Sequence, residues 1–331
     1  MSDPTKFKQA KELRQKGALM CLARLPQSGR LFVGCADSLV YEVDAAAEKP
    51  EFKAFPTGHE TYVTSLALAG GSLISGGYDG RLCWWDLEKR ELVRTVAAHG
   101  RWIRGLAATP DGKTLVSVAD DMLTRLWNAA TGELLQSLSN HAPITPHHYP
   151  SMLYAVAVSP CGKYLATGDK VGHVVISELA GGTKVAELET PVMYTWDPTA
   201  RRHSIGGIRS LAFSPDSKLL AVGGMGKVGN IDHLEGVTRV EIFDWSAGTR
   251  THELAGNKTK GLIERLVFHP DDLWLAAAGG DNKGVLLFYD LAANKQLHQI
   301  DAPAHLHSIT LDETATTIYG VGHERALVWA M

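Results

Sequence analysis

Cysteine is scarce in this chain of 331 residues, which has only Cys21, Cys35, Cys83 and Cys161. No two of them form a Cys-x-x-Cys pair, so neither a disulfide framework nor a zinc knuckle is predicted. Long apolar runs are missing too. None approaches the ~18–20 residues that span a bilayer, and the charged N-terminus lacks the apolar core of a secretory signal. These absences predict a reduced, cytoplasmic location and no membrane partner.

An excess of positive charge is also absent. Lysine and arginine number 33 against 36 aspartates and glutamates, a formal net charge of −3. A large nucleic-acid footprint needs clustered basic residues, so no nucleic-acid partner is predicted. Helical periodicity is lacking as well, and the 33 glycines are spread through the chain. That distribution is typical of many short strands joined by tight turns.

A unit of about 40 residues recurs along the chain, which indicates a repeat architecture. The segment from Leu66 to Asp86 reads LALAGGSLISGGYDGRLCWWD, and the segment from Leu106 to Asn128 repeats its pattern. Further copies begin near Val156, Leu211 and Leu266. Each unit alternates short apolar runs with polar or glycine-containing turns, which predicts four antiparallel strands per unit.

These units resemble WD40 repeats, a family that folds as a β-propeller. Two units carry the most specific pattern, with a Ser four residues before an Asp and a Trp six residues after it. They contain His59, Ser75, Asp79 and Trp85, and then His99, Ser117, Asp121 and Trp127. The resemblance implies an all-β fold, with residues 1–331 forming a single seven-bladed propeller of four-stranded antiparallel blades. The last unit ends at its third strand, so the N-terminal segment (1–16) is expected to close the ring by supplying the fourth.

Two patterns that suggest enzymes have simpler interpretations. His59, Ser75 and Asp79 could be read as a catalytic set. The set recurs in the next unit, however, and the resemblance implies a buried hydrogen-bond network in each blade. The run from Gly224 to Gly229 spells a dinucleotide-binding fingerprint, but no helix follows it, so a glycine-rich loop is predicted. No catalytic residue, cofactor or metal ligand is therefore predicted.

Three insertions interrupt the repeat, at residues 140–151, 190–205 and 225–238. The resemblance implies that all three emerge on one face, and long loops on a rigid scaffold commonly bind partners. Their predicted partner-binding residues are His147, His148, Tyr149, Tyr194, Trp196, Asp197, Arg201, Arg202, His203, Asp232, His233 and Glu235. By the family pattern, Tyr62 and Trp102 lie at the mouth of the central channel and join this set.

The predicted function is that of a non-catalytic scaffold that binds a protein or peptide through this face. Trp196 would be an apolar anchor, Arg201 and Arg202 would bind carboxylate or phosphate groups, and His233 would make binding sensitive to pH. A propeller enzyme, or a protein that binds a small ligand or metal through its loop histidines, is the alternative. The loops could also simply pack on one another.

Overall fold

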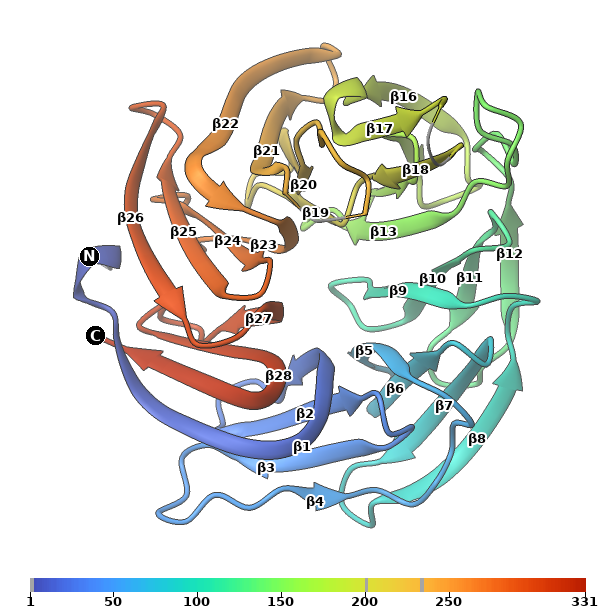
Figure 1. Ribbon diagram of the computed structural model, residues 1–331. Helices are drawn as coiled ribbons and strands as arrows, with labels where there is room; N and C mark the ends of the chain where they lie inside the picture. Colours follow the sequence, from blue (N-terminus) through green and yellow to red (C-terminus); the bar gives the residue numbers. More distant parts are fainter. Residues whose placement is uncertain (1–2, 200–201, 233–234) are drawn as a thin grey trace. The chain divides into compact units, whose positions relative to one another are not determined.

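The computed structural model describes residues 3–199, 202–232 and 235–331. In these ranges the fold is all-β, and its helical elements are two short 3-10 turns, η1 (Pro4–Lys6) and η2 (Pro191–Met193). No helix in the described part is long and apolar enough to cross a membrane. The sheets are antiparallel (Figure 1), and the chain divides into two compact units. The first unit comprises residues 1–138 and 307–331, and the second unit comprises residues 139–306.

Two sheets of the first unit are four-stranded meanders. They consist of β5 (Val63–Ala69), β6 (Ser72–Gly77), β7 (Arg81–Asp86) and β8 (Glu91–Ala97), and of β9 (Ile103–Ala108), β10 (Thr114–Ala119), β11 (Thr124–Asn128) and β12 (Leu134–Leu138). The inner strands β6 and β10 are almost wholly buried, because apolar side chains cover both of their faces. The outermost strand β8 instead alternates between exposed and half-buried positions. Each predicted repeat in this region therefore forms one sheet with a solvated outer edge.

The remaining sheet of the first unit has six strands, in the order β27-β28-β1-β2-β3-β4. Its strands are β1 (Lys8–Arg24), β2 (Arg30–Cys35), β3 (Val40–Asp44), β4 (Lys53–Ala54), β27 (Leu306–Leu311) and β28 (Thr317–Ala330). The first half of β1 pairs with β28, and its second half pairs with β2. Figure 1 shows β1 lying beside β28, with the two chain ends close together.

The number of blades expected from the sequence differs from the number of sheets that the repeats form. Seven separate four-stranded sheets were predicted, whereas the repeats in the described residues form six sheets, one of six strands and five of four strands, and a two-stranded hairpin lies in an insertion. The prediction of seven separate sheets is wrong because β1 runs without a break through the first and last repeats and joins them. Gly17, with a φ of +89°, lies where β1 changes partners, and a left-handed backbone there favours glycine.

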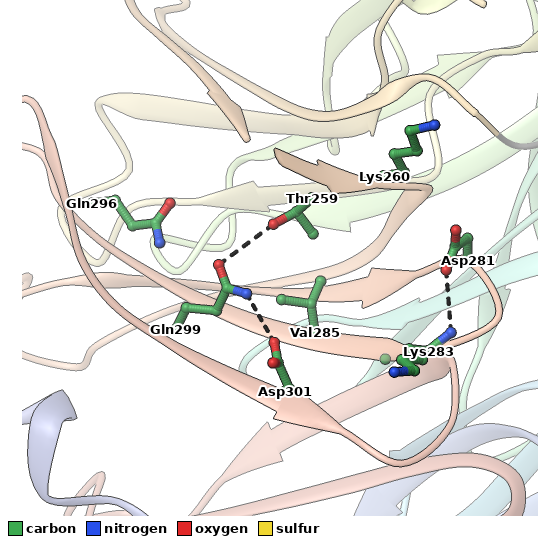
Figure 2. Close-up of a pocket in the computed structure, with 9 residues that line it drawn as sticks. Thr259, Lys260, Asp281, Lys283, Val285, Gln296, Gln299 and Asp301 are labelled. Atoms are coloured by element: carbon green, nitrogen blue, oxygen red, sulfur yellow. Dashed lines mark hydrogen bonds between the residues drawn. The ribbon is translucent and has the colours of Figure 1, made fainter. Parts of the chain in front are cut away.

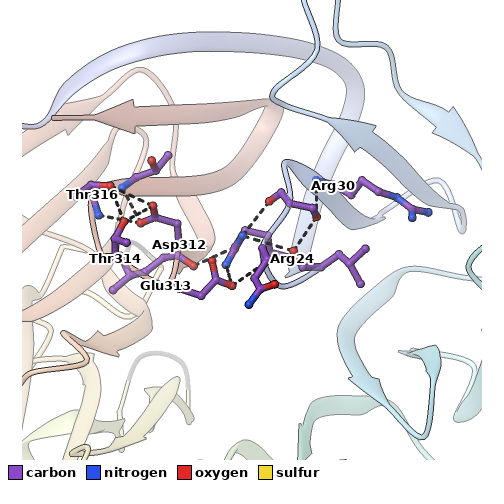
Figure 3. A network of polar contacts seen from close by, with 11 residues as sticks. Arg24, Arg30, Asp312, Glu313, Thr314 and Thr316 are labelled. Carbon is purple, nitrogen blue, oxygen red and sulfur yellow. Dashed lines mark hydrogen bonds and ion pairs between the residues drawn. The ribbon is translucent and has the colours of Figure 1, made fainter.

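A buried arginine joins the turns of the first and last repeats (Figure 3). Arg24, at the end of β1, donates from Nε to the carbonyl of Leu311 at 3.2 Å and from Nη1 to the carbonyl of Ser28 at 2.9 Å. It also forms an ion pair with Glu313, whose carboxylate accepts from the backbone N–H of Gln27 at 2.9 Å. Arg24 thus connects the turn that follows β1 with the turn that follows β27, although Glu313 lies 289 positions further along the chain.

The second unit has three four-stranded meanders and one hairpin. The meanders are β13 (Leu153–Val158), β14 (Tyr164–Asp169), β15 (His173–Glu178) and β16 (Lys184–Glu189); β19 (Ser210–Phe213), β20 (Leu219–Met225), β21 (Val237–Asp244) and β22 (Thr249–Lys260); and β23 (Leu262–Phe268), β24 (Leu275–Gly280), β25 (Gly284–Asp290) and β26 (Lys295–Ala302). The hairpin pairs β17 (Tyr194–Asp197) with β18 (His203–Gly206). It lies within the insertion at 190–205, so that insertion has regular structure of its own.

Candidate functional site

The hydrogen-bond network that the resemblance implies is present in the β5–β8 sheet. His59 Nε2 lies 2.7 Å from Ser75 Oγ, and Trp85 Nε1 donates to the same hydroxyl at 2.8 Å. His59 Nδ1 lies 3.1 Å from Asp79. The β9–β12 sheet repeats this arrangement with His99, Ser117, Asp121 and Trp127, at 2.7, 3.0 and 2.9 Å. Because both serine hydroxyls are buried and occupied, these sets connect the strands of a sheet.

The charges of the His59–Asp79 pair stabilise one another. Burial alone lowers the pKa of His59, but the hydrogen bond to Asp79 and the neighbouring Cys83 outweigh it and raise the pKa to about 9. Burial also raises the pKa of Asp79, while the hydrogen bonds from His59 and from the backbone of Glu60 bring it below its usual value. Both groups are therefore held in their charged forms.

A third, altered version of this network occurs in the second unit. His141 lies within the insertion at 140–151, yet its side chain is buried. Its Nε2 lies 2.8 Å from Thr167 Oγ1, and its Nδ1 lies 3.3 Å from Asp169. The pattern was missed because this carboxylate follows Thr167 by two positions instead of four. Ser177, in the place of the tryptophan, accepts from Asn140 at 2.9 Å.

Two of the insertions meet in a group of rings, named here the insert-loop cluster: His147, Tyr149, Tyr194 and Trp196. The ring of His147 stacks on Trp196, with centroids 4.3 Å apart and planes 12° apart. Tyr149 packs on the same indole at 5.5 Å, and His147 Nδ1 lies 3.0 Å from the Tyr194 hydroxyl. The indole of Trp196 is therefore in contact with two side chains of a different loop.

Local backbone structure explains this arrangement. In the first insertion, the N–H of Tyr149 bonds to Thr145 Oγ1 at 3.2 Å, and the N–H of Thr145 bonds to the Tyr149 carbonyl at 2.7 Å. This tight turn fixes His147 and Tyr149 close together. In the second insertion, the β17–β18 hairpin places Trp196 opposite Ser204. A hydrogen-bonded turn and a short hairpin thus position the rings.

The second and third insertions are in contact. The N–H of Val228 donates to Thr195 Oγ1 at 3.0 Å, and Ile205 packs against Met225 and Val228. The contact runs through residues that the sequence analysis did not name. Among the other predicted residues, Asp197 is half-buried, whereas His148 on the first insertion and Arg202, His203, Asp232 and Glu235 on the other two are exposed. Arg201 and His233 lie outside the described residues.

A second group of rings lies in the first unit and is named here the aromatic platform: Tyr62, Tyr78 and Trp102. Tyr78 stacks between the other two, with centroids 5.6 Å from Tyr62 and 4.3 Å from Trp102. Arg104 donates to the Tyr78 hydroxyl at 2.7 Å and binds both oxygens of Asp120 at 2.8 Å. The family pattern pointed to Tyr62 and Trp102. It missed Tyr78, although an aromatic residue in the turn before Asp79 was a visible signal.

Two observations concern the alternative of a metal or small-ligand site. Among the described residues, no group of three or more His, Cys, Asp and Glu side chains is arranged to hold a metal ion. A cavity of about 680 Å³ does open in the second unit (Figure 2). It is lined by Thr259, Lys260, Asp281, Lys283, Gly284, Val285, Gln296, Gln299 and Asp301. Gln299 donates to Asp301 at 2.8 Å, and the loop histidines are not part of the lining.

Comparison with known proteins agrees with the repeat pattern. Four segments match the family model described as WD domain, G-beta repeat, at residues 51–86, 90–128, 197–228 and 248–288. Telomerase protein component 1 of Mus musculus is 26% identical over 282 residues, which are 85% of this chain and 9% of that protein. Nuclear distribution protein PAC1 of Arthroderma otae is 27% identical over 222 residues, which are 59% of this chain and 45% of that protein.

A shorter match is closer in sequence. The p21-activated protein kinase-interacting protein 1-like of Danio rerio is 33% identical over 104 residues, which are 30% of this chain and 28% of that protein. The chain thus spans less than half the length of each of these three relatives.

Proposed function

Because this chain is a WD40-repeat protein, we propose that it acts as a non-catalytic scaffold that binds a protein or peptide through its insertions. Proteins of this family are β-propellers that typically serve as interaction platforms, and each four-stranded sheet corresponds to one blade. The name of one relative states that it interacts with p21-activated protein kinase, which fits an interaction role. The partner proposed here is a protein, with no part for nucleic acid or membrane, in a reduced compartment such as the cytoplasm.

The observation that carries this proposal is the position of Trp196 in the insert-loop cluster. The indole is half-buried, with His147 stacked on it and Tyr149 packed against it. Tyr149 itself is 44% exposed. Tryptophan and tyrosine dominate binding energy at protein interfaces, most of all when they are held rigidly before the partner arrives. A preformed aromatic surface of this kind suits the apolar centre of an interface.

Polar residues on the same insertions supply the rim of the proposed interface. Arg202, His203, Asp232 and Glu235 are exposed on the second and third insertions, where the edge of a bound partner would lie. Arg201 and His233 complete this set on the strength of the sequence alone. Arginine at this rim favours a partner that offers carboxylate or phosphate groups, because the guanidinium can bind both oxygens at once.

The proposal also includes closure of the propeller by the N-terminal strand. Its support is the pairing of residues 8–14 with residues 325–330 in the first unit. Closure leaves β28 without an open edge, and such edges invite aggregation.

A capture experiment with matched variants tests the function. The chain, its Trp196→Ala variant and its Val185→Ala variant are immobilised, and bound proteins are identified by mass spectrometry. Val185 is a control in the same unit, 43% exposed on the outer strand β16. We expect the wild type and Val185→Ala to retain one common partner. Trp196→Ala should lose about 2 kcal/mol of binding, a roughly 30-fold weaker affinity. Equal capture by all three would refute a role for the insert-loop cluster.

A further inference from the structure

The aromatic platform of the first unit is open at both ends. Tyr62 is 46% exposed and Trp102 is 48% exposed, although each stacks on Tyr78. The planes of neighbouring rings differ by only 26° and 10°. A further planar group can therefore extend the stack at either end. Parallel rings do not surround a common centre, so this geometry offers no cage for an alkylammonium ion.

The platform is rigid before any ligand arrives. The N–H of Tyr78 bonds to the Tyr62 carbonyl, and the N–H of Asp120 bonds to the Trp102 carbonyl, both at 3.0 Å. Arg104 ties these two turns together through the Tyr78 hydroxyl and both oxygens of Asp120. Because the side chains are already ordered, a ligand would lose little binding energy to arranging them.

The charges around the rings decide which ligand fits. The Arg104 guanidinium lies 4.9 Å from the ring centroid of Tyr78 and 5.1 Å from that of Trp102. It therefore already makes the cation–π contacts that a positively charged ligand would make with these two rings. Asp120 neutralises this arginine. Arg101 is exposed beside Trp102, and no carboxylate of the described residues forms an ion pair with it. The uncompensated charge on the residue that precedes Trp102 in the chain is therefore positive.

We propose that the aromatic platform binds a short peptide segment in which an aromatic side chain lies next to a carboxylate. The aromatic ring would stack on Trp102, and the carboxylate would pair with Arg101. Single-stranded nucleic acid also stacks on aromatic rings, but it needs a groove lined with several cations. Here one free arginine stands beside the stack, which favours the peptide. This inference rests on the proposed function, because it assigns a second binding surface to the same scaffold.

Isothermal titration calorimetry with the full chain tests the proposal. The probe is the peptide acetyl-Glu-Asp-Phe-Glu-amide. Three further probes separate the possibilities: the same peptide with alanine for phenylalanine, a version with lysines for the acids, and oligothymidylate. We expect binding of the first probe, and at least tenfold weaker binding of the other three. Absent binding of the first probe, or tighter binding of the lysine peptide or of oligothymidylate, would overturn the proposal.

Variants locate the site. Trp102→Ala and Arg101→Glu should each weaken binding of the acidic aromatic peptide at least tenfold, while Arg101→Lys keeps part of it. Leu135→Ala and Lys113→Glu change exposed residues elsewhere in the first unit and should leave binding unchanged. Thermal melting checks that each variant is folded. Unchanged binding by folded Trp102→Ala and Arg101→Glu overturns the inference. Trp196→Ala, in the second unit, should have no effect in this titration, so the insert-loop interface is judged separately by its own capture experiment.

Discussion

His59 Nδ1 lies 3.1 Å from each carboxylate oxygen of Asp79, and the histidine side chain is fully buried. The pKa of His59 is raised to about 9 from its ordinary value of 6.5. A histidine with a raised folded-state pKa contributes its full stabilisation below pH 6.5 and loses it as the pH rises through about 9. We expect the free energy of unfolding to fall by about 1–3 kcal/mol over this interval. Urea denaturation at several pH values measures it.

Asp79 makes the free energy of unfolding depend on pH in the acidic range as well. Its pKa lies below the ordinary value of 3.8, so its contribution is complete above that pH and is lost as the pH falls through the folded-state pKa. The His59→Gln variant is the control for the alkaline limb, because glutamine does not titrate. A slope between pH 6.5 and 9 that is equally steep in this variant would show that other groups cause it.

Replacement of Asp79 by alanine should destabilise the chain by about 1–3 kcal/mol, because a buried, charged His59 loses its partner. Asp121→Ala should have a similar effect through His99, while Glu91→Ala, on the exposed edge of β8, should have almost none. Chemical denaturation of the three variants compares them directly. A normal unfolding free energy for Asp79→Ala, combined with the loss of a catalytic activity, would instead support the enzyme alternative.

The repeat pattern predicted most of the fold because the signals that define a blade are local. Turns such as Pro110-Asp111-Gly112 and the spacing of Ser75, Asp79 and Trp85 depend on a few neighbouring residues. The resemblance predicted that residues 1–16 supply the fourth strand of the last repeat, but the continuation of that strand into the first repeat was not predictable from the sequence. It depends on β1 continuing through Gly17 and pairing with a strand some 300 residues away. No local pattern encodes that continuity.

The candidate site was predictable in composition but not in geometry. The insertions identified Trp196, Tyr194, His147 and Tyr149 as exceptions to the repeat, and these four side chains do meet. The stacking of His147 on Trp196 was not predictable, because it depends on the relative positions of two loops that are attached to different strands. The network of His141 was not recognised in the sequence because its carboxylate partner, Asp169, follows a different spacing.

Removal of residues 1–16 should lower the free energy of unfolding by several kcal/mol, because β28 loses a paired strand. The lost contacts include two hydrogen bonds from Lys11 Nζ, to the carbonyls of Ala45 at 2.7 Å and Ala47 at 3.1 Å. Thermal melting of the truncated chain measures the change. Arg14→Ala, which changes a side chain of the same strand that is 78% exposed, should melt like the full chain. An unchanged midpoint for the longer truncation would contradict the closing role of this strand.

Tyr289 takes the place in its sheet that Trp85 holds in the β5–β8 sheet. It is buried, and its hydroxyl has no hydrogen-bond partner among the described residues. The register explains this, since Tyr289 pairs with Leu275 as Trp85 pairs with Leu73, which places Ala277 where the other sheet has Ser75. Burial raises the pKa of Tyr289, so the hydroxyl stays neutral. Tyr289→Phe should therefore stabilise the chain by about 1 kcal/mol, since it removes a buried polar group that lacks a partner.

Tyr41→Phe is the matched control for this substitution. The Tyr41 hydroxyl is also on a buried side chain, but it donates to Asp37 at 2.6 Å. Its removal should cost about 1 kcal/mol, since a satisfied hydrogen bond is lost. Urea denaturation of both variants should move the unfolding free energy in opposite directions. A loss of stability in Tyr289→Phe as large as that in Tyr41→Phe would mean that the Tyr289 hydroxyl has a partner, such as a buried water between it and the neighbouring strands.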